Sequence, residues 1–210
     1  MRTADSGGAN GEVTPVNNLT EFFRDGFAKA LAHQHVSLAE HTSHYVVSLL
    51  VLYSRTEVSH ADMRPGQRWV SLADLLAQAS AAASCAEREA LLQRLGDVSL
   101  FVAAFFAHGF ERRLVDVDYH IAMGGRAYST LATTSISGPR HTLCGVFGEL
   151  ARKFQPVVDA IGEISDTARV WGPNDVLRLY ELWLKTGSRR AHGLLRRLGV
   201  APIQASLQMN

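Results

Sequence analysis

The stretch that decides the fold is Leu95–Leu131, LGDVSLFVAAFFAHGFERRLVDVDYHIAMGGRAYSTL, where an apolar, aromatic-rich run meets charged residues, a Tyr-His pair and two adjacent glycines. We interpret it as the core of a helical domain, because the chain has no alternating strand pattern of useful length. Several polar side chains adjoin segments expected to be buried, and a polar group removed from water must find a partner. This region is therefore the best candidate for a site.

Size and composition indicate a single globular domain. The 210 residues suffice for one substantial core, and 47% hydrophobic with 20% charged residues is an ordinary globular composition. A formal net charge of +1 creates no overall field that would attract nucleic acid or an anionic membrane. We expect a helical domain at residues 18–200, preceded by a disordered tail (1–17) and followed by a C-terminal tail (201–210).

The two cysteines and the N-terminus favour a cytoplasmic protein. Cys85 and Cys144 are too few for a disulfide framework and lack the close spacing of a zinc site, so we expect reduced and buried thiols. Residues 1–18 contain no apolar segment of the secretory-signal type. The longest apolar runs are shorter than the roughly 18 to 20 residues that cross a bilayer, so we predict no transmembrane segment.

Three helix starts are marked by a capping side chain followed three residues later by an acid: Asn18–Glu21, Ser37–Glu40 and Ser71–Asp74. In this arrangement two backbone N–H groups can be hydrogen-bonded reciprocally. Apolar residues lie on both sides of the second helix, which predicts a central and nearly enclosed helix.

Turn residues divide the remainder into further helices. Gly96 is expected to end one helix in a left-handed conformation, and Asp97 to cap the next from Val98 onward. Pro156 should kink or interrupt a long segment at 141–164. Other helices are expected at 72–83, 86–95, 116–133, 175–185 and 187–198. The sequence thus predicts an all-α fold, an irregular bundle of eight or nine helices.

Nine histidines raise the question of a metal site. Glu40 with His44, and Asp116 with His120, would each share a helix face at a spacing of four residues. This spacing differs from the Glu-x-x-His and His-Glu-x-x-His patterns of helical metal sites, and Glu40 already serves the predicted cap. We expect no metal site.

A ligand site between helices is a second hypothesis. Gly124 and Gly125 lie in a helical pattern, where each costs about 1 kcal/mol relative to alanine, so either close helix packing or an opening for a ligand should compensate. The polar residues expected around such an opening are His44, Tyr45, Asp97, Arg112, Asp116, Tyr119, His120 and Tyr128.

The function predicted from these patterns is a binding or regulatory module that acts as a homo-oligomer or with a protein partner. The alternative is a small-molecule sensor or an enzyme with an inter-helical polar pocket. A metal-dependent protein of this kind is less favoured. No nucleotide-binding or hydrolase motif is present, and neither a catalytic residue nor a cofactor can be named.

A basic patch near the C-terminus comprises Lys185, Arg189, Arg190, Arg196 and Arg197. Without a helix-turn-helix pattern it does not predict nucleic-acid binding.

Overall fold

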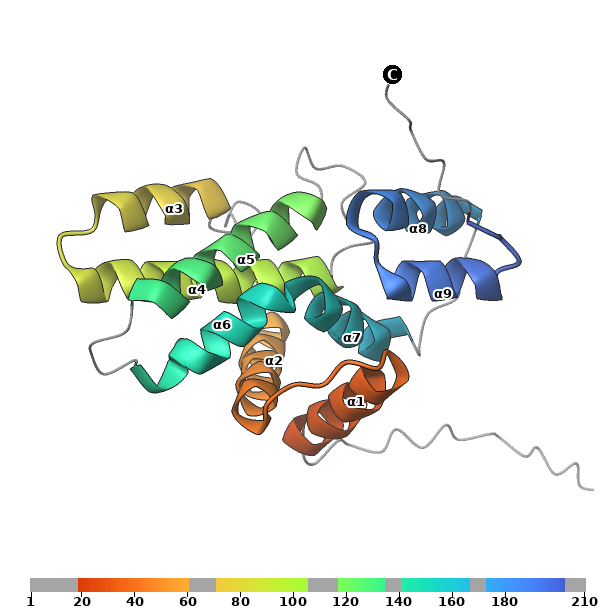
Figure 1. Cartoon of the computed structure of the whole chain (residues 1–210), viewed down its shortest axis with the longest axis horizontal. Helices are drawn as coiled ribbons and strands as arrows, with labels where there is room; N and C mark the ends of the chain where they lie inside the picture. The colour runs from red at the N-terminus through yellow and green to blue at the C-terminus, as the bar shows by residue number, and fades with distance from the viewer. Residues whose placement is uncertain (1–18, 61–70, 106–116, 135–140, 167–172, 203–210) are drawn as a thin grey trace, which may run out of the picture.

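The computed structural model describes residues 19–60, 71–105, 117–134, 141–166 and 173–202. Within these residues the chain forms nine α-helices, one short 3-10 turn and no strand, which confirms the predicted all-α class (Figure 1). The elements are α1 (Leu19–His33), α2 (Glu40–His60), α3 (Leu72–Ala81), α4 (Cys85–Phe105), α5 (Val117–Thr134), η2 (His141–Leu143), α6 (Cys144–Arg152), α7 (Phe154–Asp166), α8 (Pro173–Thr186) and α9 (Arg189–Arg197). Apart from Ala201 and Pro202, the two predicted tails lie outside the described residues.

Helix α4 is the centre of the fold. It contacts α3, α5 and α7, and residues 99–104 are all buried. The helix continues through Gly96 and Asp97, so the predicted helix end at Gly96 and N-cap at Asp97 are wrong. Both residues serve packing instead: Gly96 lies against the ring of Tyr128, and the Asp97 carboxylate accepts hydrogen bonds from side chains of other helices.

Helix α2 is covered on one side only. Val46, Val47, Leu49 and Leu50 are buried against the core, whereas Ser48 is exposed and Leu52 is 62% exposed. The prediction that this helix is central and enclosed is therefore wrong. The central position belongs to α4, which has the larger contacts with neighbouring helices.

Two predicted helix starts are capped differently from the expectation. Helix α2 begins at Glu40 rather than directly after Ser37, and the N–H of Ala39 donates to Oε2 of Glu149 on α6 (3.0 Å). Ser71 does precede α3, but its side chain makes no cap hydrogen bond. An acid from a distant helix thus replaces the local capping box at α2.

The break between α6 and α7 lies at Lys153, three residues before Pro156. Pro156 falls in the first turn of α7, where its missing N–H removes no intrahelical hydrogen bond.

Helices α8 and α9 form a hairpin at one end of the molecule, beside α7, with a small core of its own (Figure 1). Cys85 is exposed, contrary to expectation, and Cys144 is partly buried.

Candidate functional site

The structure brings three of the eight predicted site residues together: Tyr45, Asp97 and Tyr128. Both phenol hydroxyls donate to the same carboxylate oxygen, Oδ1 of Asp97, at 2.6 Å from Tyr45 and 2.7 Å from Tyr128. Gln93 donates from Nε2 to the Tyr45 hydroxyl at 3.1 Å. One oxygen atom therefore joins α2, α4 and α5.

Burial determines the protonation behaviour of this cluster. Burial raises the pKa of Asp97 to about 6, although the hydrogen bonds from both phenols act in the opposite direction. The pKa values of Tyr45 and Tyr128 are raised by burial and by the neighbouring carboxylate, so both remain neutral donors at physiological pH. The cluster is a packed polar junction with a carboxyl group that titrates near neutral pH.

Both tyrosines of the junction pack against Phe147 of α6. The Tyr128 ring is fully buried and stacks on Phe147, with ring centroids 5.6 Å apart and an interplanar angle of 12°. Tyr45 meets the same phenylalanine edge-on at 5.9 Å. These ring contacts add packing to the hydrogen bonds that join α2, α4 and α5, whereas Asp97 itself is partly exposed.

The other predicted site residues do not converge on Asp97. His44 is exposed on α2 and Tyr119 is 37% exposed on α5. His120 is buried, and its ring packs edge-on against Tyr119. Arg112 and Asp116 lie outside the described residues, and with Asp116 the metal pair considered for Asp116 and His120. Within the described part of the chain, no three His, Cys, Asp or Glu side chains are grouped to hold a metal ion.

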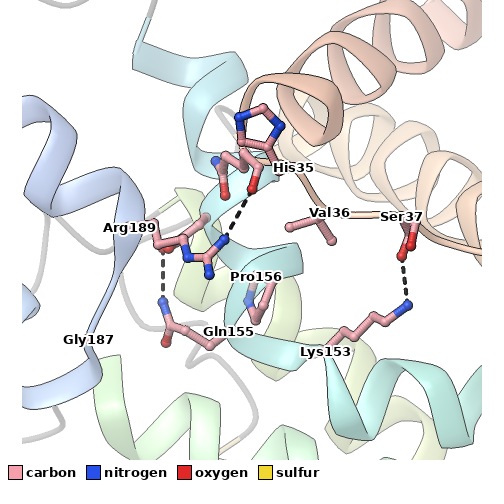
Figure 2. Close-up of a pocket in the computed structure, with 10 residues that line it drawn as sticks. His35, Val36, Ser37, Lys153, Gln155, Pro156, Gly187 and Arg189 are labelled. Carbon is pink, nitrogen blue, oxygen red and sulfur yellow. Dashed lines mark hydrogen bonds between the residues drawn. The ribbon is translucent and has the colours of Figure 1, made fainter.

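A pocket of about 330 Å³ lies elsewhere, between the α1–α2 connection, the start of α7 and the start of α9 (Figure 2). No sequence pattern predicted this pocket. Its lining residues belong mostly to helix ends and connections, and the sequence marks such boundaries without showing which of them meet in space. The lining consists of Gln34, His35, Val36, Ser37, Lys153, Gln155, Pro156, Asp159, Gly187 and Arg189.

The α1–α2 wall is a tight helix end held by the α6–α7 junction. His35 adopts a left-handed conformation (φ 56°), and the N–H groups of His35 and Val36 bond back to Ala32 (3.2 Å) and Leu31 (2.9 Å). These two bonds form a Schellman motif with histidine at the position glycine usually occupies. Lys153 donates from Nζ to the carbonyl of Ser37 at 2.7 Å, which fixes the far end of this wall.

The α9 wall is fastened by Asp159 of α7. Its Oδ1 accepts from the Ser188 hydroxyl (2.7 Å) and from Nε2 of Gln155 (2.9 Å), and its Oδ2 accepts from the N–H of Arg190 (3.4 Å). Burial raises the pKa of Asp159, although these hydrogen bonds and the positive charge of Arg190 oppose the shift. A carboxylate from α7 thus caps α9 together with the local cap Ser188, whose Oγ accepts from the N–H of Ala191.

The predicted basic patch is divided by the structure. Arg190 is buried, and its Nε and Nη2 bind the two carboxylate oxygens of Asp166 at 2.7 and 2.6 Å. Gly162 makes room for this guanidinium, because a Cβ atom there would lie 2.8 Å from its Cζ. Arg196 and Arg197 are exposed at the other end of α9, and Arg189 is exposed at the pocket.

The two pocket cations are bound to different degrees. Lys153 Nζ is held by the Ser37 carbonyl and by Oε1 of Glu149 at 2.8 Å. Arg189 makes one long hydrogen bond to the described residues, from Nη1 to the carbonyl of Gln34 at 3.4 Å. Most of its guanidinium donors are therefore available at the pocket.

Comparison with known proteins found no match. The chain matches no protein-family model, no curated protein and no solved structure to which it was compared. Among the described helices, none has the length and apolar character to cross a bilayer.

Proposed function

We propose that this protein is a helical ligand-binding module with a regulatory role, and that its ligand site is the pocket between the α1–α2 connection, α7 and α9. The observation that carries the proposal is the volume of about 330 Å³ at a place where apolar and polar groups face one opening. Val36 and Pro156 supply apolar surface, and Arg189 and Lys153 supply charge. Inter-helical pockets of a few hundred Å³ with this mixed lining are typical of small-molecule sites.

The regulatory part of the proposal follows from which segments of the chain form the walls of the pocket. Three segments distant in the sequence meet at the pocket, and one of them belongs to the α8–α9 hairpin, which has its own small core. A ligand that contacts both the α1–α2 connection and α9 would stabilise the hairpin against the body of the protein. An enzyme acting at the predicted polar residues is less well supported, because the hydroxyls of Tyr45 and Tyr128 already bind Oδ1 of Asp97 and the other described candidates do not converge on it.

The test is a fragment screen on the full-length protein by NMR, with neutral, cationic and anionic compounds. We expect hits that shift the amide signals of Val36, Gln155 and Arg189. Ser37→Trp should block these hits by filling the pocket, whereas Ser48→Trp, on the exposed side of α2, should not. If no compound perturbs these amides in the wild type, the proposed function is wrong.

A second candidate function is self-association through an exposed helix face. The location expected from the sequence is the cytoplasm. Leu177 and Leu184 of α8 are 68% and 53% exposed and, seven residues apart, lie on one helix face. Sedimentation velocity should show a dimer that Leu177→Glu dissociates and that Leu52→Glu, at a similarly exposed leucine of α2, leaves intact. A monomeric wild type at high protein concentration would exclude this candidate.

A further inference from the structure

We infer that the pocket binds a small organic acid, and that the guanidinium of Arg189 holds its anionic group. The inference rests on the proposed function and names the chemical class of the ligand. Such an acid has a compact oxyanion, which it shares with inorganic phosphate. It also has a short aliphatic body, which phosphate lacks.

Arg189 has the features of an anion-binding side chain that is not yet engaged. It is exposed at the first residue of α9, and its single hydrogen bond to the described residues, 3.4 Å long, leads to a neutral carbonyl. A guanidinium offers five N–H donors in a plane that matches the two oxygens of a carboxylate or phosphate. An incoming oxyanion would form charge-assisted hydrogen bonds and displace only this weak contact.

The charges around the pocket favour an anion over a cation. Asp159 is the one carboxylate among the described lining residues; it is 3% exposed, and it already accepts hydrogen bonds from Ser188, Gln155 and the N–H of Arg190. The carboxylate of Asp159 is thus already hydrogen-bonded within the protein. Of the two lining cations, Lys153 is paired with Glu149 outside the lining, so Arg189 is the lining cation without an ion pair among the described residues.

The arrangement of the lining also suggests the form of the ligand. Figure 2 shows Arg189 and Lys153 on opposite sides of the pocket, with Val36 and Pro156 between them. An ammonium has three N–H donors, and Ser37 and Glu149 accept two of those of Lys153. A short dicarboxylate would place one carboxylate at Arg189, its methylene groups over Val36 and Pro156, and its second acceptor toward Lys153.

The experiment is an NMR titration of the full-length protein with succinate, with inorganic phosphate and with the neutral analogue succinamide. We expect succinate to shift the amides of residues 34–37, 155 and 189. Arg189→Gln should weaken this binding about tenfold to a hundredfold, the usual loss for a hydrogen bond to a charged group. The matched control Arg196→Gln, an exposed arginine at the other end of α9, should leave it within about twofold.

The phosphate titration distinguishes the two sources of an oxyanion. Stronger binding of succinate than of phosphate supports the organic acid, and stronger binding of phosphate overturns it. Equal binding of succinate to both arginine variants, or binding of succinamide as tight as that of succinate, also overturns the inference. In each of these cases fragment hits at the pocket would still support the proposed function, which fails only if no compound binds there. The control for folding is thermal unfolding, in which Arg189→Gln should have the same midpoint temperature as the wild type.

Discussion

Gly96 lies so close to Tyr128 that a Cβ atom at position 96 would be 2.6 Å from Cε1 of the tyrosine ring. The same tyrosine donates its hydroxyl proton to Asp97, the next residue along α4. The Gly-Asp pair therefore works as one unit: the glycine admits the ring, and the aspartate binds its hydroxyl.

Gly96→Ala should destabilise the protein by about 1 to 3 kcal/mol, because the fully buried Tyr128 ring has no free space into which to move. Urea unfolding measures the effect. Gly193→Ala on α9 is the control: its Cβ would meet nothing within 4 Å, and alanine favours a helix by up to about 1 kcal/mol. Equal changes in the two variants would contradict the packing role of Gly96.

The Asp97 carboxyl should make stability depend on pH. Its pKa is about 6 in the folded protein, against an ordinary value of 3.8 when the chain is unfolded, so the folded state binds more protons between these values. The free energy of unfolding therefore falls as pH rises through this range. Asp97→Asn removes this titration, and its stability relative to wild type should rise on the order of 3 kcal/mol from about pH 4 to about pH 7. Parallel pH profiles in urea unfolding would show that Asp97 is not the responsible group.

The buried pair of Arg190 and Asp166 should be sensitive to loss of one partner. Arg190→Met leaves the Asp166 side chain, 7% exposed, without its counter-charge, which costs about 3 to 5 kcal/mol. Replacing both residues, Arg190→Met with Asp166→Leu, should recover much of this loss. Chemical denaturation of Arg196→Met gives the baseline, since this arginine is exposed on the same helix. A double variant as unstable as the single one would refute the explanation.

His35→Gly should stabilise the protein by up to about 1 kcal/mol. A left-handed conformation strains a residue that has a Cβ atom, and glycine avoids that strain at some cost in chain entropy. His44→Gly, at an exposed helical position, should instead destabilise by about 0.5 kcal/mol. Calorimetry of the two variants checks the opposite signs, and a loss of stability in His35→Gly would argue against strain at the pocket wall.

Helix content was largely predictable, because helical periodicity and turn residues act over a few neighbouring positions. The predicted helices at 72–83, 116–133 and 175–185 correspond to α3, α5 and α8. The errors arose where a distant residue replaced a local signal. Gly96 looked like a helix end because glycine commonly occupies that position, but the ring of Tyr128 is what requires it.

The candidate site shows the same division. The sequence singled out Tyr45, Asp97 and Tyr128, since polar groups among apolar helices need partners. It did not show that two phenol hydroxyls would bind one oxygen of Asp97, nor that the ends of α1, α7 and α9 would form a pocket. Which helix ends meet depends on how the helices pack in space.

The sequence by itself determined an all-helical chain and most of its helix boundaries, because backbone hydrogen bonding, glycine and proline act locally. Only the tertiary structure decided that α4 is central, that Glu149 and Asp159 cap helices distant in the sequence, and that Arg189 faces a pocket. The physical reason is that burial and charge pairing depend on neighbours brought together by packing, which no local pattern of residues specifies.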